Sequence, residues 1–331
     1  MKRLGNTLKY IFFLGLGLGI FFYVYPLDEI KVIWQKLKEA NYFILLPMGI
    51  LAIAAHYSRG LRWKMLIDPL GYQVRGFSAF RGVMIGYYFN TLVPRMGEVS
   101  RCVALNRIDK VPVSSSLGTV ITERIFDLIM LVVVVGSAIL IQFDVIGDFV
   151  IESLKAKLDS SSGLLSIGTL LFILGGIGGL FILYYALKKL GILDKILGLL
   201  KQFKEGVISV RKLKNPWSFV GHTLFIWASY LTTCYLVFYT YDETAALGLK
   251  EALAVFALGT IGFIAPVPGG IGTYQIMFAL GLSFYLIDET TAKSVAMISF
   301  MANTVLNLIV GAIMLNFSPE KLKIDAQQTE G

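Results

Sequence analysis

The sequence predicts an all-α polytopic membrane protein, with about six full transmembrane helices plus two re-entrant helical hairpins in an inverted repeat. Its 331 residues are 56% hydrophobic and 16% charged, whereas soluble domains have roughly 25% charged residues. The mean hydropathy of +0.71 means more apolar surface than a soluble fold can cover. The apolar runs are continuous rather than alternating, which disfavours a transmembrane β-barrel. We therefore expect a single integral membrane domain over residues 1–331.

Six apolar runs approach the ~20 residues that a membrane-spanning helix needs. They cover residues 8–25, 41–58, 115–141, 164–187, 217–239 and 291–316. The first run is similar to a secretory signal peptide, but it lacks a convincing small-residue cleavage site and further spans follow it. We therefore expect it to remain as the first transmembrane helix.

Lysine and arginine in the connecting loops orient these spans, because cytoplasmic loops carry an excess of positive charge. Residues 1–9 and 59–81 are basic, whereas residues 143–162 contain four acids and two lysines. Six crossings then place both termini in the cytoplasm of a bacterium, with the protein in the inner membrane. The basic segment 188–214 is expected to form a cytoplasmic amphipathic helix, and residues 317–331 a cytoplasmic tail.

Two further apolar stretches, 77–107 and 251–287, are each interrupted near the middle by proline and glycine. Proline removes a backbone donor and glycine permits positive φ, so each stretch predicts a helix, a break and a second helix. Neither stretch can cross the membrane without upsetting the charge bias, so both are expected to be re-entrant, from opposite sides. The residues singled out at the breaks are Asn90, Pro94 and Gly97 in the first, and Pro266, Pro268, Gly269, Gly270, Gly272 and Gln275 in the second.

The order of these elements predicts an inverted repeat. A span, a hairpin and a span occupy residues 41–142, and the same order recurs over residues 217–316. The first unit starts outside the cell and the second inside, so the two units have inverted topology. Such repeats place a substrate site near the membrane midplane, between broken helices.

Charged residues follow the first break. Arg95 lies at the break itself, and Glu98 and Arg101 are three residues apart on one face of the next helix. The free N–H groups and the positive dipole end of such a helix suit an anionic group, which favours a phosphate-binding site at the membrane. The alternative is that both arginines are interfacial residues that reach the headgroups, with Glu98 as a local partner.

A second charged group lies on the third predicted span. Glu123 and Asp127 are four residues apart on one face, Arg124 lies beside them, and residues 128–141 are apolar. These charges must therefore lie inside the bilayer, where each costs ~2.5–3.5 kcal/mol and usually faces a partner or a cavity. Two compatible interpretations remain open: a structural ion cluster that holds the hairpin to this helix, or the lining of a site.

Other function classes lack support in the sequence. It contains no HExxH, GxSxG, paired-cysteine or P-loop pattern, so neither an energised pump nor a known hydrolase is indicated. No catalytic residue, cofactor or metal is expected. The formal net charge of +8 follows from the basic cytoplasmic loops, so a nucleic-acid partner is not expected.

Three motifs, PRMGEVSR, ERIFD and PVPGGIGTYQ, resemble in order and spacing the lysylphosphatidylglycerol synthase transmembrane family, over roughly residues 5–316. This family is the flippase-like membrane region of the bacterial multiple-peptide-resistance factor. The resemblance implies a stand-alone member without the soluble synthase domain, and therefore without the synthetic activity. The family's motif positions fall on Pro94, Gly97, Glu98 and Arg101, then on Glu123, Arg124 and Asp127, and finally on Pro268, Gly269, Gly270 and Gly272. Where the family often has a glutamate, this chain has Gln275.

The expected function is that of a flippase-like protein that binds or translocates a lipid headgroup in a polar intramembrane cleft. The lipid would be an aminoacyl-phospholipid or a polyprenyl-linked glycolipid. The residues expected to meet its phosphate are Arg95, Arg101 and Arg124, and those expected to meet a cationic headgroup or to brace the arginines are Glu98, Glu123 and Asp127.

Two alternatives remain open. A secondary transporter of a small polar solute uses the same inverted architecture. A non-transporting membrane partner of a lipid-modifying enzyme could recruit that enzyme through residues 188–214. Membrane lipids are the expected partners in the leading interpretation, and a homo-oligomer remains open in each of them.

Overall fold

The computed structural model describes residues 15, 17, 19–27, 29–93, 96–143, 210, 213–265 and 267–316. Within these ranges the regular structure is helical and no strand occurs, which confirms the all-helical class. The predicted span 164–187, the tail 317–331 and nearly all of the segment 188–214 lie outside the described residues. The break residues Pro94, Arg95 and Pro266 lie outside them as well.

Four helical segments of the described chain are long and apolar enough to cross a membrane, namely Tyr42–Leu70, Val113–Ile141, Pro216–Thr240 and Glu289–Asn316. They match four of the six predicted spans. Their main helices are α3 (Leu45–Ile67), α6 (Val113–Ile141), α10 (Pro216–Leu236) and α14 (Glu289–Asn316), and short 3-10 helices extend two of them: η1 (Tyr42–Ile44), η2 (Asp68–Leu70) and η3 (Val237–Thr240). The predicted first span, residues 8–25, is described only in part, so the total of six crossings stays a prediction.

The helix that contains the second predicted span extends beyond residue 58. Helix α3 continues to Ile67, so Arg59 and Arg62 are helical and buried, and the cytoplasmic location of residues 59–81 stays a prediction. Counting loop charges missed this extension, because an arginine after an apolar run carries the same charge whether it faces water or a buried carboxylate. The buried residues Trp63 and Ile67 continue the helical period beyond both arginines.

Both interrupted stretches form two helices separated by a break. In the first, α4 (Gly76–Leu92) ends in the extended residue Val93, and α5 (Gly97–Asp109) follows. In the second, α12 (Leu249–Ile264) leads through the 3-10 turn η4 (Pro268–Gly270) into α13 (Thr273–Ser283). The longest of the four helices has 17 residues, fewer than the ~20 that a full crossing needs.

Glycine makes the second break and the helix contacts of both hairpins possible. The φ angles of Gly269 and Gly272 are +57° and +82°, a region that residues with a Cβ rarely adopt. A Cβ on Gly97 would lie 2.6 Å from the carbonyl oxygen of Gly86, and one on Gly262 would lie 2.5 Å from that of Thr273. Each hairpin is therefore closed by a backbone approach that only glycine allows.

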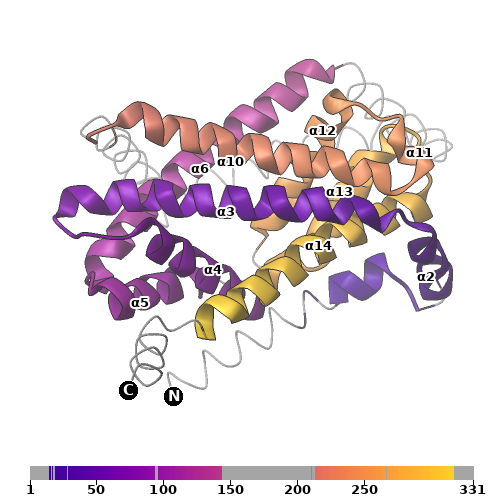
Figure 1. Ribbon diagram of the computed structural model, residues 1–331. Helices are drawn as coiled ribbons and strands as arrows, with labels where there is room; N and C mark the ends of the chain where they lie inside the picture. Colours follow the sequence, from indigo (N-terminus) through magenta and orange to yellow (C-terminus); the bar gives the residue numbers. More distant parts are fainter. Residues whose placement is uncertain are drawn as a thin grey trace, which may run out of the picture.

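The hairpins lie toward opposite ends of the long helices. Figure 1 shows α3 and α10 side by side, with α4 and α5 toward one end of them and α12 and α13 toward the other. The two breaks approach each other, since a Cβ on Gly269 would lie 3.9 Å from the Cα atom of Thr91 near the end of α4. Re-entrant insertion and the inverted repeat of residues 41–142 and 217–316 stay predictions.

A short helix is tied to the end of the molecule near α12. Helix α2 (Ile30–Glu39) is joined to α11 (Asp242–Ala245) by a hydrogen bond of 2.5 Å from Lys36 Nζ to Glu243 Oε1. Lys293 of α14 pairs at 2.7 Å with Glu29, at the start of α2. These contacts fix α2 across the ends of the long helices.

Candidate functional site

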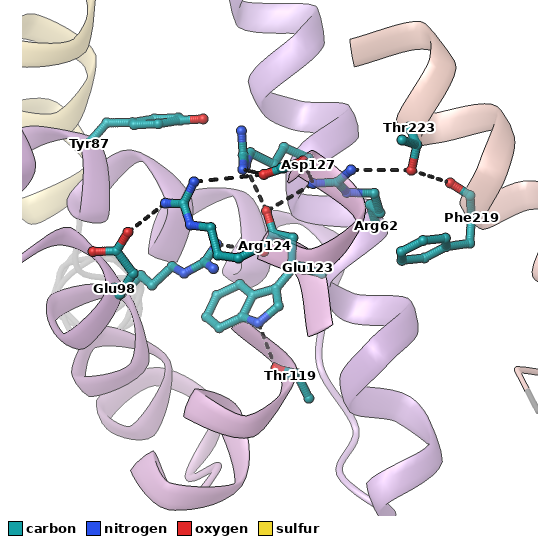
Figure 2. A network of polar contacts seen from close by, with 12 residues as sticks. Arg62, Tyr87, Glu98, Thr119, Glu123, Arg124, Asp127, Phe219 and Thr223 are labelled. Carbon is teal, nitrogen blue, oxygen red and sulfur yellow. Dashed lines mark hydrogen bonds and ion pairs between the residues drawn. The ribbon is translucent and has the colours of Figure 1, made fainter. Parts of the chain in front are cut away.

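A buried cluster of charged residues joins α3, α5 and α6. Its members are Arg59 and Arg62 of α3, Glu98 and Arg101 of α5, and Glu123, Arg124 and Asp127 of α6. We refer to these residues as the ionic cluster. In Figure 2 the labelled members point toward one another, with Thr223 of α10 at the side of the group.

Helical spacing and close packing bring these side chains together. The arginines of α3 are three residues apart and the two buried acids of α6 are four apart, so each pair lies on one face of its helix. Trp63 of α3 donates a hydrogen bond from Nε1 to Thr119 Oγ1 of α6 at 2.9 Å. The guanidinium carbon of Arg101 lies 4.8 Å from the centre of the Trp63 ring. One tryptophan therefore sets the distances among all three helices.

Glu123 lies at the centre of the ionic cluster. Its fully buried carboxylate pairs with Arg59 at 2.7 Å, with Arg62 at 3.1 Å and with Arg101 at 2.8 Å. A carboxylate that has lost its water needs such partners, because the desolvation penalty of an isolated ion is several kcal/mol. Glu123 is therefore the shared counter-ion of three arginines.

Asp127 extends the network toward α10. It pairs with Arg59, with Arg62 at 2.8 Å and with Arg124 at 3.7 Å. Arg62 also donates to Thr223 Oγ1 at 3.2 Å, and Arg59 to the hydroxyl of Tyr230 at 3.3 Å. Both arginines of α3 are thus shared between the acids of α6 and neutral oxygen atoms of α10.

Arg124 and Glu98 form the exposed edge of the ionic cluster. Their side chains pair at 2.6 Å and are 48% and 28% exposed, respectively. The side chains of Arg62 and Glu123, by contrast, are fully buried. A molecule from the surroundings can therefore reach the cluster beside Arg124.

Positive charge exceeds negative charge in the ionic cluster. In the described part of the chain, four arginines face three carboxylates, which leaves one positive charge in excess. Arg101 is 4% exposed, and its Nε and Nη2 atoms, like Nε of Arg62, have no hydrogen-bond partner among the described residues. Buried donors without an acceptor are costly, so these atoms are suited to receive an anion.

Neutral polar groups lie directly beside the charged ones. The Tyr87 ring of α4 lies 4.6 Å from that of His56 and 5.9 Å from the guanidinium carbon of Arg59, measured from the ring centre. The hydroxyls of Tyr87 and Tyr230 are 3.4 Å apart. Trp227, three residues before Tyr230, lies in the apolar cluster that Tyr230 borders; it is 8% exposed, and its Nε1 atom lacks a hydrogen-bond partner within the described ranges.

The predicted site residues divide between this cluster and the second break. The structure brings together Glu98, Arg101, Glu123, Arg124 and Asp127. Asn90 lies at the first break, where its Cβ atom would be 2.9 Å from a Cβ on Gly97. At the second break, Gln275 is fully buried and accepts a hydrogen bond from the backbone N–H of Gly272 at 2.7 Å.

Sequence reasoning missed the arginines of α3 and the tyrosines beside them. Arg59 follows His56 by three residues, and Arg62 follows Arg59 by three, so all of them lie near one face of a continued helix. This spacing is the signal that could have found them. Across the described residues, no group of three or more His, Cys, Asp or Glu side chains could hold a metal ion.

Comparisons with known proteins agree in pointing to membrane proteins. A family model described as the lysylphosphatidylglycerol synthase TM region matches residues 10–311. The chain is similar to a UPF0104 membrane protein of Methanocaldococcus jannaschii, with 24% identity over 86% of this chain and 87% of that protein. A UPF0104 membrane protein of Pyrococcus horikoshii is 23% identical over 82% of this chain and 86% of its own length.

A more distant relative is longer than this chain. Glycosyltransferase AglD of Haloferax volcanii is 22% identical over 83% of this chain, which corresponds to 48% of that protein. No solved structure matches the chain.

Proposed function

The chain belongs to the lysylphosphatidylglycerol synthase transmembrane family, and from this premise we propose that it is a flippase-like protein that binds a lipid headgroup at the ionic cluster and moves it across the bilayer. The family match over residues 10–311 confirms the resemblance carried by the three motifs. A multi-pass membrane location follows from the family and from the apolar helices. Cytoplasmic termini and a bacterial inner membrane are part of the proposal.

The observation that carries the proposal is the buried guanidinium of Arg101, which pairs with Glu123 through Nη1 but leaves Nε and Nη2 without a partner among the described residues, in a cluster with excess positive charge. A phosphate group accepts two parallel hydrogen bonds from a guanidinium, and this geometry is specific to arginine. Removal from water strengthens the attraction, because the effective dielectric constant around the cluster is low. The headgroup phosphate therefore binds Arg101 and Arg124, while the lipid tails remain in the bilayer.

The acids position the arginines in this proposal. Glu123 and Asp127 each contact several arginines, and they hold the guanidinium groups in fixed orientations before the lipid arrives. In this proposal the ionic cluster both holds the α4–α5 hairpin to α6 and lines the binding site. Arg95, which precedes α5 in the sequence, is proposed to add positive charge for the phosphate.

The candidate headgroups come from the relatives as well as from the cluster. The family description names an aminoacyl-phospholipid synthase region. Similarity to a protein named as a glycosyltransferase adds lipid-linked sugars to the candidates. Each of these lipids contains the phosphate that Arg101 and Arg124 are proposed to hold.

The test is lipid movement in liposomes that contain the purified protein. Lipids with a fluorescent tail and a native headgroup are incorporated, and a membrane-impermeant reductant bleaches the outer leaflet. The wild-type protein should accelerate the loss of inner-leaflet fluorescence for at least one phospholipid or lipid-linked sugar. Rates equal to those of empty liposomes across the whole panel would contradict the proposal.

Variants of Arg101 separate the site from the scaffold. Arg101→Lys keeps a positive charge beside Glu123 but loses the forked guanidinium, so the protein should fold while lipid movement falls by about tenfold or more. Arg107→Lys is the matched control, because Arg107 lies on the same helix and is exposed. Equal rates for the two variants would assign Arg101 to the scaffold alone.

A further inference from the structure

We infer that the lipid headgroup is an anionic phosphodiester whose second substituent is uncharged and hydroxylated, a glycerol or a sugar, rather than a cationic aminoacyl group. This inference rests on the proposed function, because it concerns the chemistry of the same ionic cluster. It narrows the candidate lipids to those with a net negative headgroup. It also excludes, as the preferred lipid of this chain, the aminoacyl-phospholipid that the family name suggests.

The buried acids of the ionic cluster are already paired with arginines. Glu123 contacts three arginines of the ionic cluster, and Asp127 contacts Arg59, Arg62 and Arg124. The ammonium groups of a lysyl headgroup would have to displace a guanidinium from one of these carboxylates. Arg101, whose one carboxylate partner among the described residues is Glu123, would then remain buried without a counter-ion, and breaking a buried pair costs ~3–5 kcal/mol. Arg59 and Arg62 would each lose one of their two carboxylate partners.

Glu98 is the acid of the described cluster most open to a cation. It pairs with Arg124 at 2.6 Å, and its second oxygen, Oε2, is itself buried and has no hydrogen-bond partner among the described residues. An ammonium group at this oxygen would lie close to the Arg124 guanidinium, where like charges repel. Glu98 therefore weakens the attraction of Arg124 for an anion. A variant of Glu98 distinguishes a cationic from an anionic headgroup.

Uncharged polar groups border the arginines of the ionic cluster. Tyr87 follows Gly86, and a Cβ on Gly86 would lie 3.2 Å from the Cβ atom of Arg101. Tyr87 in turn contacts Tyr230, which accepts a hydrogen bond from Arg59. Glu123 joins Arg101 to Arg59, so a substituent that extends from a phosphate at Arg101 toward Arg59 meets the neutral rings and hydroxyls of Tyr87 and Tyr230.

Trp227 belongs to an apolar cluster with Val134, Ala138, Ile226 and Ala257, which Tyr230 borders, and it carries an unused donor. It lies three residues from Tyr230 and four from Thr223, so the three side chains share one face of α10. Its buried Nε1–H has no acceptor within the described ranges, and an indole N–H can only donate. A hydroxyl oxygen of a glycerol or a sugar satisfies this donor, whereas an ammonium group cannot accept a hydrogen bond.

The experiment compares tail-labelled lipids with native headgroups in the same liposome assay. Phosphatidylglycerol and a polyprenyl phosphohexose should each be compared with lysyl-phosphatidylglycerol and with phosphatidic acid. The faster of the first two should move at least about tenfold faster than lysyl-phosphatidylglycerol, as expected for one displaced charge-assisted contact. Which of the two is faster identifies the substituent as glycerol or sugar.

The outcomes separate this inference from the proposed function. Rapid movement of lysyl-phosphatidylglycerol would overturn the inference and leave the flippase proposal standing, whereas no movement of any lipid would overturn both. Phosphatidic acid, which has no hydroxylated substituent, should move more slowly than phosphatidylglycerol. Equal rates for these two would contradict the role given to the neutral groups.

Two variants sharpen the result. Glu98→Gln releases Arg124, so the apparent affinity for the preferred anionic lipid should rise about 2- to 5-fold; a fall would indicate a cation at Glu98.

Trp227→Phe removes the N–H donor and should slow the hydroxylated lipid by about 3- to 10-fold without slowing phosphatidic acid. Trp217→Phe is the matched control, because Trp217 lies on α10 and is 81% exposed. Equal effects of the two tryptophan variants would contradict the contact with Trp227.

Discussion

The two hairpins share a backbone plan but differ in the chemistry that follows the break. In the α4–α5 hairpin, the second helix carries Glu98 and Arg101 into an ionic cluster with α6. In the α12–α13 hairpin, the corresponding helix carries Tyr274, hydrogen-bonded to Ser299 at 2.8 Å, and Gln275, bonded to the backbone of Gly272. Buried charge in the first hairpin is thus replaced by neutral hydrogen bonds in the second.

This difference shows that a broken helix does not by itself make a binding site. Both breaks depend on glycine, and both bring two helices into close backbone contact. The α12–α13 hairpin packs into a large apolar cluster that includes Val255, Phe278 and Leu282, which suits a supporting element. The α4–α5 hairpin presents unpaired guanidinium donors, so we assign binding to it.

The largest expected effect comes from removing the central acid of the ionic cluster. Glu123→Ala leaves Arg59, Arg62 and Arg101 without their shared carboxylate, which should lower the free energy of unfolding by ~3–5 kcal/mol. The corresponding change in the second hairpin, Gln275→Ala, removes one helix-capping contact and should cost ~0.5–2 kcal/mol. Thermal unfolding of the two purified variants in the same detergent measures the difference. Similar losses would mean that the hairpins do not differ in this way.

An intermediate effect, equal in both hairpins, is expected at the glycines of the helix contacts. Gly97→Ala and Gly262→Ala each place a Cβ within 2.6 Å of a backbone oxygen, so each should destabilise the protein by ~1–3 kcal/mol. Gly118→Ala is the control, because no described atom lies within 4 Å of a Cβ there. The same unfolding assay applies, and a loss confined to one hairpin would contradict the shared backbone plan.

The smallest effect is expected at the exposed pair of Lys36 and Glu243, far from the ionic cluster. The hydrogen bond from Lys36 lowers the pKa of Glu243, so the stabilisation exists above the ordinary pKa of 4.5 and disappears as the pH falls through the lowered value. The Glu243 side chain is 48% exposed and solvent screens the pair, so Glu243→Gln should cost only ~0.2–1 kcal/mol. Unfolding at pH 7 and in acid should show that the difference between wild type and variant vanishes in acid.

The helical class, four of the spans and both breaks were predictable because each depends on local chemistry. Apolar length predicts a span, and proline with glycine predicts a break, whatever the partner helices are. The partners of Glu123 were not predictable in full, since Arg59 and Arg62 precede it by about 60 positions in the sequence and were counted as loop charges. Only packing of α3 against α6 turns them into its counter-ions.

The neutral part of the site was the least predictable. Tyr87, Trp227 and Tyr230 are ordinary aromatic residues of apolar helices, and aromatic residues in such helices usually face lipid or the membrane interfaces. The role proposed for them rests on the contact of Tyr230 with Arg59, on that of Tyr87 with Tyr230 and on the unused donor of Trp227. Neither feature has a local signature in the sequence.

The central claim is that Arg101 holds a lipid phosphate inside the protein. An experimental density map of the protein in a lipid nanodisc tests this most directly. The account predicts phosphate density within about 3 Å of the Arg101 guanidinium, the distance of a charge-assisted hydrogen bond, continuous with lipid tails at the exposed edge near Arg124. A map in which protein atoms seal the ionic cluster, and every lipid phosphate lies at the membrane surfaces, would contradict it.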